Sequence, residues 1–132
     1  MEYLLDTNAV IALLENPEGA LSRRLHRHAP ADFGLPSLVV HELFYGAFRS
    51  QRRDRNLATV EALQFEVVPF EQEDARHAGE IRANLVAAGQ PIGAYDFLIA
   101  GQARARDLTL ITHNLKEFRR VEGLRFENWQ DP

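Results

Sequence analysis

The feature that most constrains the fold is a regular alternation of short apolar runs with longer helical patterns along the chain. Strands are predicted at residues 2–6, 66–69, 108–112 and 125–128, where short apolar runs are bounded by polar or turn residues. No Asn-Gly or similar pair joins two of these runs as a β-hairpin. Strands separated by helices favour a parallel sheet with helices on both faces. We therefore predict an α/β protein, a three-layer α/β/α sandwich with a mainly parallel sheet.

Apolar residues at helical spacing, together with capping residues, set the expected helices. They are predicted over residues 9–15, 17–28, 38–49, 53–63, 71–88, 94–106 and 114–120. Thr7 or Asn8 is expected to cap the first helix, and Ser37 the third. Residues 33–36 form a short apolar segment. In such folds ligands bind beyond the carboxyl ends of the strands, so the residues that follow a strand are candidates for a site.

Size and composition favour one globular domain covering residues 1–132. Hydrophobic residues make up 45% and charged residues 26%, which excludes a disordered or fibrous chain. The absence of cysteine excludes disulfides, thiolate metal sites and a cysteine nucleophile. The net charge of −4 argues against binding nucleic acid by bulk charge alone. No signal peptide or membrane span is expected, and the protein is predicted to be cytoplasmic.

Three acidic residues stand out because each lies at the end of an element or inside apolar sequence. Asp6 follows the first strand, where a parallel sheet has its binding crevice, although it equally fits a helix cap. Glu42 interrupts an apolar helix, and the alternatives to a site are an ion pair with an arginine such as Arg49 or Arg53, or a carboxylate that reaches solvent. Asp96 lies in the first turn of another apolar helix, where the alternative is stabilisation of the helix start. Three such acids are difficult to explain as independent caps.

A fourth candidate, Asn114, follows the strand at 108–112 and therefore lies at the same edge of the sheet. Glu117 comes three residues later, so a capping box is a strong alternative. If the three acids converge they repel one another, and a hard divalent cation with oxygen ligands relieves that repulsion. Mg²⁺ or Mn²⁺ fits this description. Zinc is disfavoured because there is no cysteine and the histidines lack the spacing of a metal site.

Four segments carry a set of motifs in a fixed order. They read L-L-D-T-N-A-V-I-A-L at 4–13, S-x-x-x-x-E-L-x-x-G-A at 37–47, G-Q-P-I-G-A-Y-D-F-L-I-A-G-Q-A-R at 89–104, and L-T-L-I-T-H-N-L-K-E-F at 108–118. Over almost the whole chain this set resembles PIN-domain nucleases, and within them the VapC toxins of bacterial type II toxin–antitoxin pairs. The resemblance implies a PIN-like fold, Mg²⁺- or Mn²⁺-dependent cleavage of RNA, a homodimer, and inhibition by a cognate VapB-like antitoxin.

Carried over by position, the resemblance implies that Asp6, Glu42 and Asp96 bind the metal and act in catalysis. Asn114 is placed with the catalytic residues because it stands where many members have a fourth acid. Its neutral side chain argues against a second tightly bound ion. Residues expected to position substrate are Thr7, at the family's usual hydroxyl position, with Ser37, Thr112, Arg49 and Arg53. Metal-activated water is expected to attack a phosphodiester, with transfer RNA cut at a single-stranded loop.

Other parts of the chain carry expectations about partners. A basic cluster is hypothesised to contact RNA or the antitoxin; its members are Arg49, Arg52, Arg53 and Arg55. The antitoxin is expected to lie in a groove that involves the apolar helices after Asp6 and Ser37. Trp129 is expected to be a packing anchor rather than a platform for base stacking.

Two other enzyme classes and one non-enzymatic function are the alternatives. Receiver domains need paired acids near the first strand, but Leu5 precedes Asp6. Phosphatases of the haloacid dehalogenase type begin D-x-D-x-T, whereas this chain reads D-T-N-A from Asp6. The remaining alternative is a PIN-like binding or scaffold module with weak or no cleavage, for which the neutral Asn114 is the only support. A metal-binding titration would discriminate between the enzyme and the scaffold.

Overall fold

A single parallel sheet forms the centre of the protein in the computed structural model, which describes residues 1–131. Pro132, the last residue of the predicted domain, lies outside the described residues. The strands are β1 (Tyr3–Leu5), β2 (Phe33–Pro36), β3 (Glu66–Val68), β4 (Thr109–Ile111) and β5 (Phe126–Glu127). Their order in the sheet is β3-β2-β1-β4-β5, and every pairing is parallel. The apolar segment 33–36 is thus a strand, paired with β1 on one side and β3 on the other.

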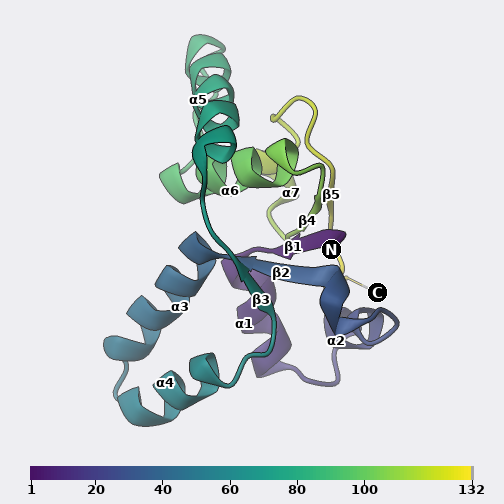
Figure 1. The fold of residues 1–132 in the computed structure, drawn as a ribbon, viewed down its shortest axis with the longest axis vertical. Helices are drawn as coiled ribbons and strands as arrows, with labels where there is room; N and C mark the ends of the chain where they lie inside the picture. The colour runs from purple at the N-terminus through teal and green to yellow at the C-terminus, as the bar shows by residue number, and fades with distance from the viewer. Residues whose placement is uncertain (132) are drawn as a thin grey trace.

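Helices cover both faces of this sheet, as predicted. They are α1 (Thr7–Glu15), α2 (Ala20–Leu25), α3 (Ser37–Phe48), α4 (Arg53–Glu61), α5 (Gln72–Ala87), α6 (Ala94–Ala105) and α7 (Leu115–Phe118), with a short 3₁₀ turn at Pro30–Asp32. Figure 1 shows α5 and α6 on one side of the sheet and α1, α3 and α4 on the other. Within residues 1–131, no helix combines the length and the hydropathy needed to cross a membrane.

The topology places the ends of three strands side by side at one edge. Because β1 lies in the middle and pairs in parallel with β2 and β4, the carboxyl ends of all three point the same way. The backbone N–H of Asp6, just after β1, donates to the carbonyl of Ile111 at the end of β4 (3.2 Å). Leu4 and Leu5 of β1 are 0% and 1% exposed, so both faces of the central strand are buried. The polar residues at this edge therefore sit on a rigid core.

Two capping predictions were wrong. Asp6, rather than Thr7 or Asn8, caps α1, because its side chain accepts a hydrogen bond from the backbone N–H of Ala9. Ser37 is the first residue of α3 and not its cap. Strand β2 runs into α3 without an intervening loop, so Pro36 takes the capping position and no side chain caps the helix there.

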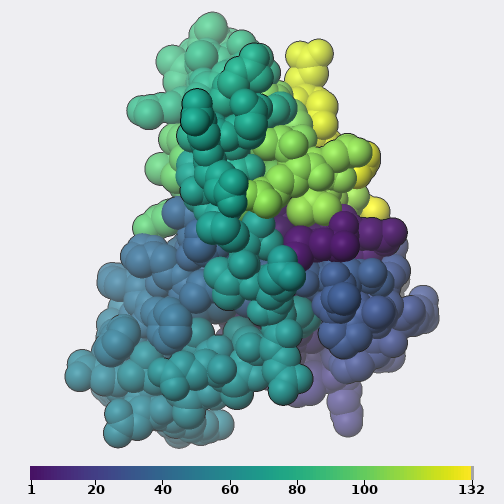
Figure 2. Space-filling model, in the orientation of Figure 1, coloured from purple at the N-terminus to yellow at the C-terminus, as the bar shows by residue number. Residues whose placement is uncertain are grey.

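A close approach of two backbones fixes how α5 and α6 pack, and Figure 2 shows the two helices in contact at one end of the molecule. An added Cβ at Gly101 of α6 would lie 2.6 Å from the backbone nitrogen of Ala78 and 2.7 Å from its Cα. Both atoms belong to the backbone of α5, so neither can rotate out of the way. Any larger residue at position 101 therefore forces the helices apart.

We expect Gly101→Ala to lower the free energy of unfolding by about 1–3 kcal/mol through overpacking. Gly79→Ala is the matched control, because a Cβ at that position of α5 meets nothing within 4 Å. Removing this helical glycine should raise stability by about 0.5–1 kcal/mol. Urea unfolding measures both variants. Equal stability of the two would contradict the close packing of α5 against α6.

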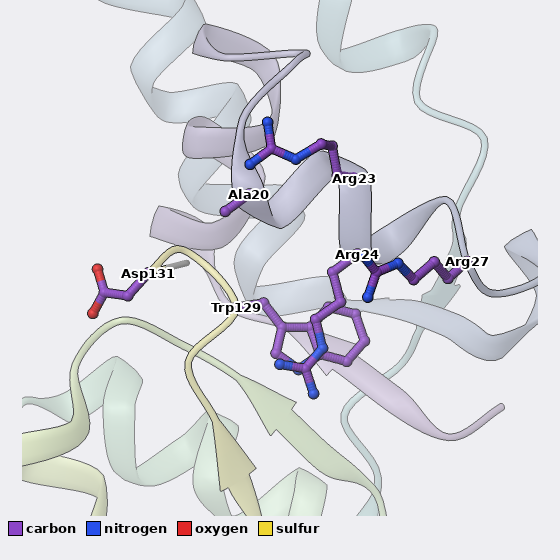
Figure 3. A pocket seen from close by; sticks show the side chains of 6 residues that line it. All are labelled: Ala20, Arg23, Arg24, Arg27, Trp129 and Asp131. Atoms are coloured by element: carbon purple, nitrogen blue, oxygen red, sulfur yellow. The ribbon is translucent and has the colours of Figure 1, made fainter.

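Trp129 anchors the C-terminal segment, as predicted from the sequence. The side chain is 1% exposed, and its ring packs against those of Tyr3, His28 and Phe33 at centroid distances of 4.9, 5.2 and 5.9 Å. The Arg24 guanidinium lies over the ring at 4.6 Å, beside an open pocket of about 350 Å³ (Figure 3). With its ring covered in this way, Trp129 offers no free face to a base.

Candidate active site

The three acids singled out in the sequence lie in one pocket at the carboxyl edge of the sheet. The pocket has a volume of about 290 Å³ and is lined by Asp6, Thr7, Asn8, Glu42, Gly93, Ala94, Tyr95, Asp96 and Ile99. Asp6 comes from the end of β1, Glu42 from α3 and Asp96 from the first turn of α6. Residues far apart in the chain thus place three carboxylates around one small volume.

Asp6 both caps α1 and lines the pocket, so its interpretation as a helix cap and its interpretation as a site residue are compatible. It is 7% exposed, and Oδ1 accepts the Ala9 N–H at 2.8 Å. Burial raises the pKa of Asp6, and the negative charge of Glu42 acts in the same direction. Hydrogen bonds from Thr112 and from the Ala9 amide partly offset this rise. The cap therefore fixes one carboxylate oxygen of a buried acid.

Glu42 is held by a hydroxyl rather than by an arginine. The Thr7 hydroxyl donates to Glu42 Oε1 at 2.8 Å across a sequence separation of 35 residues. Within residues 1–131, neither Arg49 nor Arg53 forms a salt bridge with Glu42. Arg49 lies over the ring of Tyr45, and Arg53 Nε donates to the carbonyl of Phe48. The ion pair considered as an alternative is therefore not formed.

Asp96 has the most perturbed acidity of the site. The pKa of Asp96 is raised to about 7, and burial is the largest cause. A hydrogen bond with Glu117 and the negative charge of Glu117 raise it further, and so do the charges of Asp6 and Glu42. Burial and the neighbouring acids therefore favour the protonated form of Asp96 near neutral pH. Four acids interact at this position, and the repulsion among them favours a bound cation.

Glu117 is the residue that sequence reasoning missed as a part of the site. Its spacing from Asn114 suggested a capping box, but Asn114 makes no side-chain capping bond at the start of α7. The Glu117 carboxyl instead lies beside Asp96. An acid in the helix that follows β4, at the site edge of the sheet, is the signal that could have identified it.

The other predicted residues lie around the pocket rather than in it. Asn114 is half-buried and does not line the pocket, and its backbone N–H donates to the Thr112 hydroxyl at 3.0 Å. Thr112 also hydrogen-bonds Asp6 and thus supports the site from behind. Ser37 is half-buried and does not line the pocket, and Arg49 and Arg53 are exposed outside it.

The donor set suits a hard divalent cation, although its oxygen atoms are not already gathered. Among residues 1–131, no three Asp, Glu or His side chains are grouped closely enough to hold a metal ion as they stand. One oxygen of Asp6 and one of Glu42 are engaged by the Ala9 amide and the Thr7 hydroxyl. Carboxylates are the ligands that Mg²⁺ and Mn²⁺ prefer, and their mutual repulsion here is the cost that a cation removes. The chemistry of these residues therefore fits such an ion, which Asp6, Glu42 and Asp96 would hold after a rearrangement of their side chains.

A parallel α/β sheet with acids at its carboxyl edge defines a class of α/β domain with an acidic site, and comparison with known families makes this class more specific. Residues 3–124 match the PIN domain. The chain belongs to the PIN-domain family. It shares 38% identity over 131 residues with the tRNA(fMet)-specific endonuclease VapC of Shigella flexneri, covering 98% of each chain. Ribonuclease VapC2 of Haemophilus influenzae is 37% identical with the same coverage. Within the PIN-domain family the chain is thus a member of the VapC group, as its motifs predicted.

Solved structures give the same result for the fold. The chain superposes on the crystal structure of DNA-bound VapBC from Salmonella typhimurium with a TM-score of 0.93 and 38% identity, covering 98% of both chains. VapBC2 from Rickettsia felis, bound to a DNA fragment from its promoter, gives a TM-score of 0.90 at 31% identity, covering 98% of this chain and 99% of the other. The predicted three-layer PIN-like fold is therefore confirmed.

Proposed function

We propose that this chain is a metal-dependent endoribonuclease, the toxin of a VapBC-type toxin–antitoxin pair, which cuts transfer RNA in a single-stranded loop. The observation that carries the proposal is the pocket in which Asp6, Glu42 and Asp96 meet at the carboxyl edge of the sheet. The relatives named as tRNA and RNA endonucleases support the substrate class. An RNA-cleaving toxin acts where transfer RNA is found, so we place its action in the cytoplasm.

The residues of the pocket have two proposed roles: some bind a cation, and others restrain those ligands. We assign Asp6, Glu42 and Asp96 as the cation ligands, with Glu117 next to Asp96 as a further acid. A bound Mg²⁺ or Mn²⁺ supplies a water of lowered pKa and stabilises charge on the phosphoryl oxygens. The Thr7 hydroxyl restrains Glu42, and the Ala9 amide restrains Asp6, so two of the three ligands are preoriented.

The small size of the pocket favours a single-stranded substrate. Its volume of about 290 Å³ suits part of one extended strand better than a base-paired helix. Unstacked nucleotides in an RNA loop can enter such a site, whereas paired nucleotides cannot. The backbone N–H of Asn114 donates to the Thr112 hydroxyl at 3.0 Å, and we keep Asn114 as a candidate catalytic residue beside the three acids.

Incubation of antitoxin-free protein with mixed transfer RNA and Mg²⁺ or Mn²⁺ tests this function. Discrete fragments are expected that disappear when EDTA is added, and mapping their ends gives the cut site. A metal-binding titration runs alongside. Folded protein that binds neither ion and leaves every RNA intact would favour the alternative, a PIN-like scaffold without catalysis.

A groove next to the active pocket suits the antitoxin. It has a volume of about 690 Å³ and lies between α1, α3 and α4, lined by Ile11, Leu14, Glu15, Glu42, Leu43, Gly46, Ala47, Arg55, Asn56, Thr59 and Val60. Ile11 and Leu14 are each 37% exposed, so the groove presents apolar surface that a partner could bury. Glu42 lines both the groove and the active pocket. An apolar antitoxin segment in the groove can therefore bring a cationic side chain to the acids.

Gly46→Gln is expected to weaken antitoxin binding at least about tenfold, because its side chain fills the groove that the partner needs. A Cβ at Gly46 meets nothing within 4 Å, so the fold should tolerate the change. Gly79→Gln on α5 is the matched control, with equally open surroundings. Co-purification and titration of cleavage with the VapB-type antitoxin provide the measurement. Equal inhibition of both variants would place the antitoxin elsewhere.

Two further properties belong to the same proposal. We infer a homodimer, since Val86 on α5 is 60% exposed beside an apolar pocket formed with Leu85, Pro91 and Ile92.

We also assign the exposed basic cluster at the end of α3 and the start of α4 to RNA or antitoxin contacts; its members are Arg49, Arg52, Arg53 and Arg55. Arg55 lines the groove, which favours the antitoxin for that residue. Replacing all four by Gln should impair RNA cleavage or antitoxin binding; if both were unchanged, this assignment would be wrong.

A further inference from the structure

Helix α3 exposes an unusual row of ring-bearing side chains. His41, Tyr45 and Phe48 lie four and seven residues apart, which places them on one face of the helix. Tyr45 is 60% exposed and Phe48 is 53% exposed, whereas Val39 on the buried face is 0% exposed. We call His41, Tyr45 and Phe48, together with Tyr95 of α6, the aromatic stripe. Large aromatic rings exposed to water in a row are candidates for a binding surface.

One end of the stripe is part of the active pocket. Tyr95 lines the pocket and immediately precedes Asp96, and His41 immediately precedes Glu42. The Tyr95 hydroxyl lies 3.2 Å from His41 Nδ1, and the two rings stack with centroids 5.8 Å apart at 30°. The hydrogen bond and the stacking fix both rings at the rim. The Tyr95–His41 pair therefore adjoins the acidic pocket through Tyr95.

The other end of the stripe carries positive charge. The Arg49 guanidinium lies 5.4 Å from the centre of the Tyr45 ring. Among residues 1–131, Arg49 forms no salt bridge, so its charge is available to an anion. Flat apolar faces and a free guanidinium therefore lie side by side.

We propose that the aromatic stripe binds the single-stranded RNA that flanks the scissile phosphate, by stacking bases on Tyr45 and on the Tyr95–His41 pair while Arg49 contacts the backbone. The proposal rests on the proposed ribonuclease function and adds how the substrate is positioned. RNA is favoured over an apolar peptide because the stripe joins the acidic pocket and combines rings with a cation. The apolar groove at Gly46 opens on a different face of α3 and takes the antitoxin instead.

The affinity for a short, fluorescein-labelled single-stranded RNA, measured in EDTA, distinguishes stacking on an aromatic ring from contact with any apolar side chain. Tyr45→Leu should raise the Kd about fivefold or more, because leucine offers no aromatic face. Tyr45→Phe keeps the ring and should stay within about twofold of the wild type. An abasic RNA of equal length should bind the wild type and Tyr45→Leu alike. Val67→Ala, at a 49% exposed position on β3, is the control for an exposed apolar residue outside the stripe.

Equal RNA affinity of Tyr45→Leu and the wild type would overturn the proposal. Sedimentation tests whether a second copy of the chain covers the aromatic stripe. A wild-type dimer that dissociates in Tyr45→Leu would also overturn the proposal. The parent function is read separately, from cleavage with Mg²⁺ or Mn²⁺. Ring-dependent binding without cleavage would keep the stripe and reject the nuclease, whereas cleavage without ring dependence would reject only the stripe.

Discussion

Replacing Asp96 by Asn is expected to lower the rate of RNA cleavage about a thousandfold, because loss of a carboxylate that we propose as a metal ligand removes several kcal/mol of stabilisation of the phosphoryl transition state. Asparagine has nearly the same shape, so the pocket around Asp6 and Glu42 should keep its form. The cleavage rate is measured under single-turnover conditions at saturating Mg²⁺. Asp107→Asn is the control, since the side chain of Asp107 is 87% exposed and pairs with Arg125.

The same substitution should have the opposite effect on stability when divalent cations are removed. In the folded protein the pKa of Asp96 is raised from 3.8 to about 7, so the folded state binds an extra proton between these values. Stability therefore falls as the pH rises from about 4 to about 7 and remains lower above that range. The amide introduced by Asp96→Asn carries no charge, and the variant should lack this part of the decline.

At pH 8 in EDTA, Asp96→Asn should therefore be about 1–2 kcal/mol more stable than the wild type, less than the full shift implies because the side chain is partly solvated. Added Mg²⁺ should reverse the order, since only the wild type gains from binding the ion. Urea unfolding at pH 5 and pH 8 gives the comparison. A variant that loses stability equally at both pH values, or that cleaves RNA at the wild-type rate, would contradict this account of the site.

Trp129→Ala is expected to cost about 3–5 kcal/mol of the free energy of unfolding, which is a large part of the stability of an ordinary domain. The ring contacts Tyr3 and Phe33, at the starts of β1 and β2, and also His28, which follows α2. Its Nε1 donates to Glu127 Oε1 at 3.0 Å. Truncation leaves a cavity at the point where the C-terminal segment closes over the sheet. Arg24 also loses the aromatic face that it covers.

Trp129→Phe keeps an aromatic ring and should lose only about 1–2 kcal/mol. Arg76→Ala, at an exposed position on α5, should change stability by less than about 0.5 kcal/mol. Urea unfolding at constant pH provides all three values, and cleavage by the remaining folded protein should be unaffected. A loss of less than about 1 kcal/mol for Trp129→Ala would show that the segment does not depend on this anchor.

Much of the fold could be predicted from the sequence, because the information is local. Apolar periodicity and the absence of hairpin signals indicated strands alternating with helices, and parallel pairing follows from that order. The positions of Asp6, Glu42 and Asp96 relative to these elements were also visible. Since the carboxyl ends of neighbouring parallel strands meet at one edge, their convergence in a single pocket could be expected.

Only the tertiary structure decided which neighbours these acids have. The segment 33–36 is a strand because it is buried between β1 and β3, and its own few residues could not distinguish that from a loop. The Thr7 to Glu42 hydrogen bond and the position of Glu117 beside Asp96 depend on how α1, α3, α6 and α7 pack. Side-chain contacts across long sequence separations follow from helix packing, and local periodicity carries no signal for it. The sequence thus determined the fold class and the acids, while packing set the acidity of Asp96 and the exposure of the stripe beside it.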